Sequence, residues 1–294
     1  MNEVMHHRID NFWKLEYQLK VADNSVLLYS VGETDEARYL CNALGLKEAV
    51  AGKLEELPLI FGETLTGNPT ISGNEAKGIF RHFISASLTA KNHKICVPST
   101  KRHVEEDRES GGKKYYIPTE RLEQCLPEKL CFVCQWFGTT SFESQLSFGF
   151  LSCDKAFKDV ISNIVPMVAI DEQFGGPAGG SLASTVGVKA GTEFRGEIIG
   201  LNLNQVILGG LYDVTKASES GVIKFGRHRS RGFGSVKLTI TKLSKYSVAP
   251  FREDETYDNE KLKGFLEGCL EKYSSFAKIP SQPVSVTMKL VEQR

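Results

Sequence analysis

The sequence Gly226-Arg-His-Arg-Ser-Arg-Gly-Phe-Gly234 runs directly into an alternating segment, Ser235-Val-Lys-Leu-Thr-Ile-Thr-Lys242. The alternation predicts a strand, so the glycine-rich sequence is a loop that leads into a strand. Arginine side chains bind phosphate oxygens through paired N–H donors, and glycines let a backbone approach a ligand closely. Phe233 offers a ring on which a base can stack. The arginines of this loop are Arg227, Arg229 and Arg231. The loop therefore combines three features of nucleic-acid recognition.

The composition is that of an ordinary globular protein. The chain has 294 residues, 36 basic and 36 acidic side chains, 41% hydrophobic residues and a formal net charge of zero. This length is enough for one large domain or two smaller ones. Because the overall charge is neutral, only local clustering can point to nucleic acid, and Lys224 to Lys245 is the clearest basic cluster.

Several features predict a cytoplasmic location. No window approaches the length of an apolar membrane span, so we expect no membrane partner. The N-terminal residues Met1 to Arg8 lack the apolar core of a signal peptide. Seven cysteines, an odd number, are typical of a protein kept in a reducing compartment.

Strand-like and helix-like segments interleave along the chain. This order predicts an α+β fold with a mainly antiparallel sheet. The expected strands are Phe12–Val21, Val26–Val31, Val165–Ile170, Thr192–Ile199 and Ser235–Leu243. The expected helices are Thr34–Leu46, one that opens after Thr70 and continues past Arg81, Asn204–Ala217 and Asn259–Tyr273. The charged segment Lys101–Lys114 is expected to be an exposed insertion.

Cys131 and Cys134 form one half of a zinc-type site. Cys125 lies six residues before Cys131, and either His103 or His93 could complete four ligands. The alternative is that these residues are small buried thiols in a reducing cell. The remaining cysteines are expected to be ordinary core thiols: Cys41, Cys96, Cys153 and Cys269.

Four segments together resemble the RAMP superfamily of CRISPR-associated proteins, and more narrowly the backbone subunits that coat guide RNA in multi-subunit interference complexes. The first is Pro69-Thr-Ile-Ser-Gly-Asn-Glu-Ala-Lys-Gly-Ile-Phe-Arg81, and the second is Cys131-Phe-Val-Cys-Gln-Trp-Phe-Gly138. The third is Val168 to Gly176, followed by Gly191 to Phe194, and the fourth is Arg231-Gly-Phe-Gly-Ser235. They occur in the order of the family and span most of the chain.

The resemblance implies a ferredoxin-like, RRM-type core with helical insertions and a flexible β-hairpin thumb. We therefore expect a single domain over residues 1–294, with residues 85–135 as a charged, cysteine-bearing insertion and residues 171–190 as the thumb. The resemblance also implies the partners: a CRISPR guide RNA, target nucleic acid that pairs with the guide, further copies of the chain in a filament, and other subunits of the complex.

The RNA-binding residues that the resemblance and the residue types suggest fall in three segments. They are Gly73, Asn74, Lys77 and Arg81 at a helix start, Phe174, Gly175 and Gly176 in the thumb, and Arg227, Arg229, Arg231, Gly232 and Phe233 in the arginine loop. Each segment has a plainer interpretation. The helix start could be an ordinary amphipathic helix, the glycine-rich tip Asp171–Ser181 a surface loop without function, and the arginine loop a solvated turn. Phe233 could equally anchor the strand that follows it.

Target cleavage in this family depends on an aspartate shortly before the Pro69 segment. The corresponding segment, Lys53–Phe61, contains Glu55 and Glu56 but no aspartate. The sequence thus favours a non-catalytic RNA-binding subunit with no catalytic residue and no required cofactor, and the one metal that it suggests is a structural zinc. Two alternatives remain: a metal-dependent RNA-cleaving subunit that uses Glu55 or Glu56, and a repeat-RNA-processing endoribonuclease that uses His82 or His228 as a general base.

Overall fold

The computed structural model describes residues 9–28, 68–96, 103–106, 113–116, 129–139, 142–160, 162, 165–170, 177–185, 187–280 and 284–285. Several expected features lie wholly or partly outside these residues: the end of the strand Val26–Val31, the helix Thr34–Leu46, Glu55 and Glu56, Cys125, and the segment Phe174 to Gly176.

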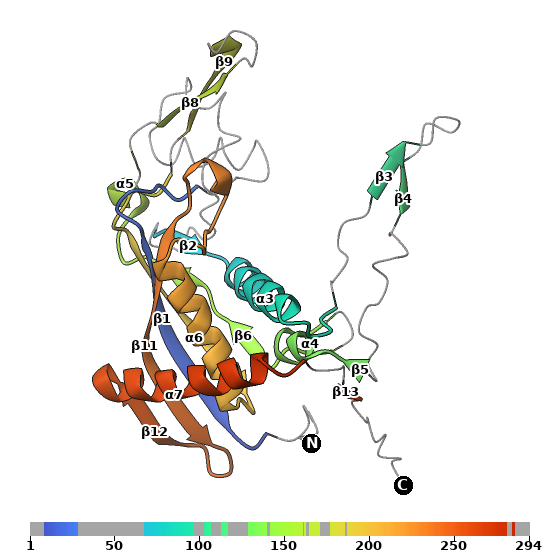
Figure 1. The fold of residues 1–294 in the computed structure, drawn as a ribbon. Helices are drawn as coiled ribbons and strands as arrows, with labels where there is room; N and C mark the ends of the chain where they lie inside the picture. Colours follow the sequence, from blue (N-terminus) through green and yellow to red (C-terminus); the bar gives the residue numbers. More distant parts are fainter. Residues whose placement is uncertain are drawn as a thin grey trace.

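The core is a seven-stranded antiparallel sheet (Figure 1). Its central strand β1 (Phe12–Val21) pairs with β10 (Glu193–Leu201) on one side and β11 (Val236–Ser247) on the other. Beyond β10 lie β6 (Leu146–Phe148), β7 (Leu151–Ser152) and β2 (Thr70–Ile71), and beyond β11 lies β12 (Arg252–Asp258).

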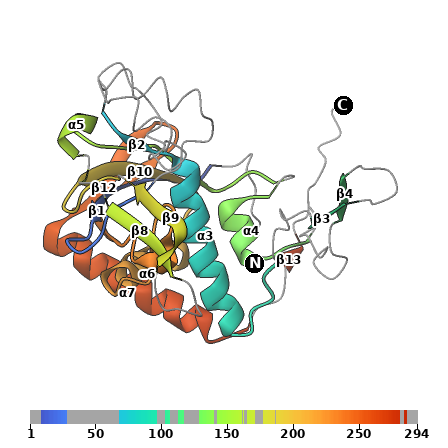
Figure 2. The ribbon, with the colours of Figure 1, turned by 90° about the horizontal axis from the view of Figure 1, so that it is seen from above.

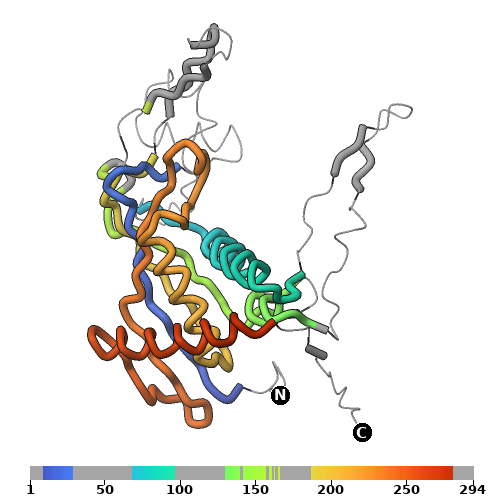
Figure 3. Tube along the Cα trace, in the orientation of Figure 1, coloured from blue at the N-terminus to red at the C-terminus, as the bar shows by residue number. Residues whose placement is uncertain are grey.

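The order of the inner strands, β11-β1-β10-β6, is that of a ferredoxin-like fold. Helix α3 (Gly73–Ala90) precedes β6 in the chain, and α6 (Gln205–Glu219) connects β10 to β11. The C-terminal helix α7 (Asn259–Ala277) follows β12, and Figure 3 traces this path from the blue β1 to the red α7. The predicted fold class is confirmed, and the expected elements that correspond to β1, β10, β11, α3, α6 and α7 lie within a few residues of the observed ones. The described part of the expected strand Val26–Val31 contains only an isolated β-bridge at Leu27.

Alternation along β1 decides which face of the sheet is buried. Trp13 and Tyr17 point to the helices, where Tyr17 meets Phe80 of α3 at 6.2 Å between ring centroids and Trp13 stacks on Phe265 of α7 at 6.1 Å. Figure 2 shows α3, α6 and α7 gathered beside the strands. Gly209 permits the close crossing of α6 and α7, because a Cβ there would lie 2.2 Å from the carbonyl oxygen of Cys269.

The opposite face of the sheet carries paired charges. Lys14 of β1 lies 2.8 Å from Glu197 of β10, and Arg195 lies 2.8 Å from Asp154. The hydrogen bond with Glu197 raises the pKa of Lys14 above its usual value. An open groove of about 770 Å³ runs over this face, bordered by the exposed ring of Phe150. We call this surface the open sheet face.

Three two-stranded ribbons stand apart from the core sheet. β8 (Val165–Ile170) pairs with β9 (Pro177–Thr185), and β3 (His103–Glu106) pairs with β4 (Lys113–Tyr116) inside the expected charged insertion. β5 (Lys129–Leu130) pairs with β13 (Val284–Ser285). The short helices are α4 (Phe132–Phe137), α5 (Phe157–Val160) and the 3-10 turn η3 (Arg229–Arg231).

The β8–β9 hairpin corrects one expectation. The glycine-rich sequence Asp171–Ser181 was expected to form the tip, yet Pro177–Ser181 belongs to β9, with Pro177 opposite Ile170. Backbone hydrogen bonds form the ladder, so glycine and alanine can continue it despite their low strand propensity. β8 coincides with the expected strand Val165–Ile170, and the range 171–190 for the whole thumb stays a prediction.

Candidate nucleic-acid interface and cysteine cluster

The arginine loop, residues 224–235, is stabilised by hydrogen bonds between its own residues. Lys224 and Ser235 form an isolated β-bridge at its neck, and the Arg231 amide donates to the carbonyl of His228 at 2.8 Å across η3. His228 and Gly232 flank η3 with φ values of 53° and 89°, in the left-handed region that glycine adopts without strain. The backbone of the loop is thus defined by its own hydrogen bonds.

Residues 25–28, which we call the anchor segment, hold the arginine loop against the core. The Arg227 amide donates to the carbonyl of Leu28 at 2.9 Å, and the Gly234 amide donates to the carbonyl of Val26 at 2.9 Å. A Cβ at Gly226 would lie 2.0 Å from the Leu28 oxygen, so this approach requires glycine.

The side chains of the loop divide by exposure. Arg227, Arg229 and Arg231 are exposed, whereas Phe233 is 8% exposed and sits edge-on to His228 at 6.3 Å. The ring of Phe233 is therefore largely covered, and its predicted contact with RNA stays a prediction. The exposed arginines present fork-shaped donors from a backbone that is held on both sides.

The start of α3 is joined to the arginine loop by Glu75. The Gly226 amide donates to Oε1 of Glu75 at 2.8 Å, across 151 positions in the sequence. The carboxylate of Glu75 thus accepts a hydrogen bond from the arginine loop. The hydrogen bond brings two of the three predicted RNA-binding segments to the same end of the sheet.

The first residues of α3 are fixed by capping and packing. Ser72 is the N-cap, and its Oγ accepts from the Asn74 amide at 3.2 Å. Gly73 is buried, and a Cβ there would lie 2.1 Å from the carbonyl oxygen of Phe148. Gly73 therefore serves the packing of α3 on β6, while Asn74 is exposed at the helix start.

Lys77 and Arg81 lie one turn apart on α3. Burial, and then the charge of Arg81, lower the pKa of Lys77. The guanidinium of Arg81 turns inward, where Nη1 donates to the Gly138 carbonyl at 2.7 Å and Nη2 to the Cys134 sulfur at 3.3 Å. Arg81 thus has a structural role, and its predicted contact with RNA stays a prediction.

The base of the β8–β9 hairpin also rests on the anchor segment. Leu27 and Val188 exchange backbone hydrogen bonds of 2.9 and 2.8 Å. A Cβ at Gly187 would lie 2.5 Å from the Leu27 oxygen, so the two backbones nearly touch. The anchor segment therefore lies between the hairpin base and the arginine loop. The predicted thumb residues Phe174, Gly175 and Gly176 lie outside the described part of the chain.

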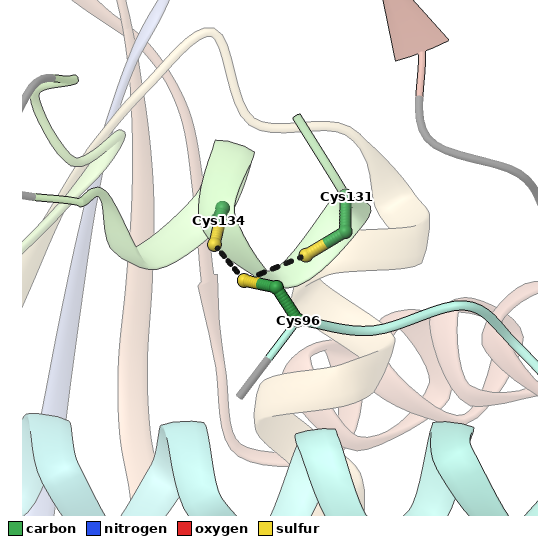
Figure 4. Close-up of side chains that lie close together, drawn as sticks. All are labelled: Cys96, Cys131 and Cys134. Carbon is green, nitrogen blue, oxygen red and sulfur yellow. Dashed lines mark hydrogen bonds between the residues drawn. The ribbon is translucent and has the colours of Figure 1, made fainter. Parts of the chain in front are cut away.

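Three cysteine sulfurs converge near the start of α4 (Figure 4). Cys96 Sγ lies 2.9 Å from Cys134 Sγ and 3.7 Å from Cys131 Sγ, and all three lie within 4.8 Å of one another. Cys131 and Cys134 are buried, and Cys96 is partly buried. Cys96, which was expected to be an ordinary core thiol, is a partly buried free thiol within this cluster, whereas Cys153 and Cys269 are buried free thiols outside it.

Hydrogen bonds among the three sulfurs shift the pKa values of Cys131 and Cys134 in opposite directions. Bonding with Cys134 and with Cys96 lowers the pKa of Cys131, and bonding with Cys131 and with Cys96 raises the pKa of Cys134.

The histidines proposed as further ligands are placed differently. His93 is buried away from the cluster, with Nε2 3.0 Å from the carbonyl oxygen of Ala277 and its ring 5.2 Å from that of Phe276. His103 lies in β3, opposite Tyr116, and its side chain is outside the described part of the structure, as is Cys125. A single cysteine after α3 has no Cys-x-x-Cys partner, so no sequence signal distinguished Cys96.

The structure combines a ferredoxin-like sheet with an arginine loop and an inserted hairpin at one end of that sheet. The model of the RAMP superfamily matches residues 57–237, more than half of the chain, and the protein therefore belongs to the RAMP superfamily. No curated protein matches the sequence. Membership makes the chain a CRISPR-associated protein of an RNA-binding family, which associates with CRISPR RNA and with other subunits. Within the described residues, no helix is long and apolar enough to cross a membrane.

Proposed function

We propose that this chain is a non-catalytic subunit that coats a CRISPR guide RNA and polymerises along it. The observation that carries the proposal is the junction at the anchor segment. Its backbone contacts both the arginine loop and the base of the β8–β9 hairpin, while Glu75 joins the same loop to the start of α3. Three segments that are far apart in the sequence thereby converge at one end of the sheet.

The chemistry of this end suits contact with the RNA backbone. Arg227, Arg229 and Arg231 present charged forks for phosphate oxygens, and phosphate contacts carry no sequence information. The loop offers no exposed ring in the position of Phe233, so bases are left available for pairing with a target. Pairing would then read the target sequence while the protein reads the shape of the backbone.

Polymerisation would follow a heterologous, head-to-tail arrangement, because a guide RNA offers successive equivalent stretches of backbone. In this arrangement the hairpin of one copy and the arginine loop of the next would bind neighbouring stretches of one RNA. Other subunits of the interference complex would cap the two ends of the filament.

The proposal is tested by the nucleic acid that the protein carries. The chain is expressed with its genomic neighbours and purified, and the bound nucleic acid is sequenced. A uniform population of short RNAs, each with a constant handle and a variable spacer, is expected. A random cellular mixture, or no RNA, would contradict the proposal.

Two variants sharpen this experiment. The triple variant Arg227→Ala, Arg229→Ala, Arg231→Ala should lose most of the bound RNA. Arg195→Ala is the matched control, because Arg195 is an exposed arginine paired with Asp154 on the open sheet face. Equal loss of RNA from both variants would show that the arginine loop has no special role.

The two enzymatic alternatives give different readouts with the same preparation. Metal-dependent turnover of a target paired with the guide, lost on Glu55→Ala or Glu56→Ala, would establish a cleaving subunit. Metal-free cutting of repeat RNA, lost on His82→Ala or His228→Ala, would establish a processing enzyme. The proposed subunit binds RNA and cuts neither substrate.

A further inference from the structure

Two lysines lie directly opposite each other at one end of the open sheet face. Lys20 of β1 pairs in register with Lys237 of β11, so both exposed side chains leave the same face of the sheet. Like charges in directly opposite positions destabilise a sheet. The carboxylate of Glu193 lies 3.6 Å from Lys20, but it also accepts a hydrogen bond from Gln18 at 2.6 Å. Among the described residues, no carboxylate pairs with the ammonium of Lys237.

Both lysines border an open hollow of about 670 Å³, which we call the lysine hollow. Its lining includes the small polar residues Asn24, Ser218 and Ser220, and the carboxylates of Asp23 and Glu219. Glu219 is paired with Lys216 at 3.8 Å, whereas the exposed Asp23 has no such partner among the described residues. The lysine hollow therefore offers two ammonium groups for an anion and one carboxylate for a hydrogen-bond donor.

The lysine hollow adjoins the arginine loop. Ser235, at the neck of the loop, lines the hollow, and its amide donates to Oγ of Ser25 in the anchor segment at 3.0 Å. The turn that carries Asp23 is closed by the Ser25 amide, which donates to the carbonyl of Ala22 at 3.0 Å. One end of the sheet thus presents both the arginines and the lysine pair (Figure 1). An RNA held by the arginine loop would pass close to the hollow.

We propose that the lysine hollow is a second RNA subsite, in which Lys20 and Lys237 bind one phosphate and Asp23 accepts a hydrogen bond from the ribose of that nucleotide. A phosphate between two ammonium groups removes their repulsion, so the like-charge pair is stabilised when RNA is bound. The 2′-hydroxyl can donate a hydrogen bond that deoxyribose lacks, so a carboxylate can select RNA over DNA. The inference rests on the proposed function, because the ligand is the guide RNA, and it adds ribose recognition to the phosphate contacts of the arginine loop.

Binding titrations of the full-length protein, freed of RNA, with a short oligouridine test the phosphate contact. The double variant Lys20→Gln, Lys237→Gln should bind about tenfold more weakly, as the loss of a charged hydrogen bond implies. The slope of log affinity against log salt should fall by about 0.7, because one phosphate contact is lost. Lys14→Gln is the matched control, since Lys14 lies on the same face of β1 but is paired with Glu197 at 2.8 Å, and it should bind like the parent. Equal affinity of the double variant and the parent would overturn the subsite.

Urea unfolding of the RNA-free protein gives a readout that a purely structural role of the lysines would not produce. Lys237→Gln removes the like charge opposite Lys20, so its unfolding midpoint should rise above that of the parent although its affinity for RNA falls. Lys14→Gln breaks an ion pair, so its midpoint should not rise. A midpoint of Lys237→Gln below that of the parent would show that Lys237 supports the fold, and would overturn the proposal.

Ribose recognition is tested by comparing oligouridine with oligodeoxyuridine of the same length. The parent protein should prefer oligouridine, and Asp23→Ala should reduce that preference by about tenfold, because a hydrogen bond to a charged group is lost. A preference that Asp23→Ala leaves unchanged would overturn the role of Asp23.

The guide RNA that co-purifies with each variant separates this inference from the proposed function. If the triple arginine variant loses the guide while the lysine double variant retains it and binds oligouridine as tightly as the parent, only the subsite is refuted. If even the parent protein carries no guide RNA, the proposed function itself fails.

Discussion

At the scale of residues, the proposed function requires the arginines of the loop to act through charge rather than through base recognition. Arg227→Ala, Arg229→Ala and Arg231→Ala should each weaken binding to RNAs of different sequence by the same factor, because phosphates are common to all of them. Each loss should also lower the slope of log affinity against log salt by about 0.7, the value for one phosphate contact on a single strand. Binding titrations at several salt concentrations measure both. A loss confined to some sequences would indicate base contact instead.

Glu75 offers a second test at this scale, because its charge and its hydrogen bond act in opposite directions. Glu75→Gln keeps an oxygen that can accept from the Gly226 amide and removes a negative charge near the RNA. Its affinity for RNA should equal or exceed that of the parent. Glu75→Ala releases the loop, so its affinity should fall and its free energy of unfolding should drop by about 1–2 kcal/mol.

Binding titrations and urea unfolding of Glu75→Gln and Glu75→Ala show whether Glu75 positions the loop or only repels phosphate. If both variants bind RNA more tightly, Glu75 merely repels phosphate and does not position the loop.

At the scale of elements, α3 is fixed at its first turn by close packing on β6. Gly73→Ala would push a Cβ into the Phe148 carbonyl, and such overpacking costs about 1–3 kcal/mol in unfolding free energy. Gly78→Ala is the matched control, because a Cβ there meets nothing within 4 Å, and it should stabilise the helix by about 0.5–1 kcal/mol. Urea unfolding measures both. A stabilising effect at Gly73 would mean that α3 does not pack against β6 as described.

The elements of the core were predictable because their patterns are local. The alternation in Phe12–Val21 predicts β1. Asn204 predicts the start of α6, because its side chain caps the Val206 and Ile207 amides. The start of β9 was expected to be a loop because its residues include glycine, alanine and serine, which have low strand propensity. Backbone pairing alone extends that ladder.

At the scale of the whole molecule, buried phenols link stability to alkaline pH. Burial raises the pKa of Tyr273 to about 12 and raises that of Tyr17 still further above its usual value of 10.0. These phenols stay neutral in the fold while the unfolded chain ionises. The contribution of these two phenols to the free energy of unfolding is therefore complete below about pH 10, and it is lost as the pH rises through their pKa values in the folded protein.

The free energy of unfolding should accordingly fall above pH 10, with each of these tyrosines contributing up to about 1.4 kcal/mol per pH unit. Urea unfolding between about pH 8 and pH 11 measures the slope, and Tyr273→Phe should reduce it. The absorbance of tyrosinate should confirm late titration of the two rings in the native protein. A slope that Tyr273→Phe leaves unchanged would mean that this ring is not protected.

The convergence of the site could not be predicted, because it depends on long-range contacts. The arginine loop was apparent from its residue types, but nothing local in Ser25 to Leu28 shows that this segment joins the loop to the hairpin base. Likewise, Cys96 meets Cys131 and Cys134 only after α3 and α4 pack, and Glu75 meets the Gly226 amide across 151 positions of the sequence. The exposure of Phe233 is a further example, because the local sequence does not show that the folded chain leaves its ring only 8% exposed.

The paired charges of the open sheet face have a consequence for association kinetics. Lys14 and Glu197, and Arg195 and Asp154, largely cancel one another, and the whole chain has a formal net charge of zero. Such a molecule exerts little attraction on a polyanion at a distance, so encounters with RNA gain little from electrostatic steering. Salt should then act mainly on how long the RNA stays bound rather than on how fast it arrives. Abundant cellular RNAs, which would crowd a strongly cationic protein, would be released quickly, and only those held at several contacts would remain.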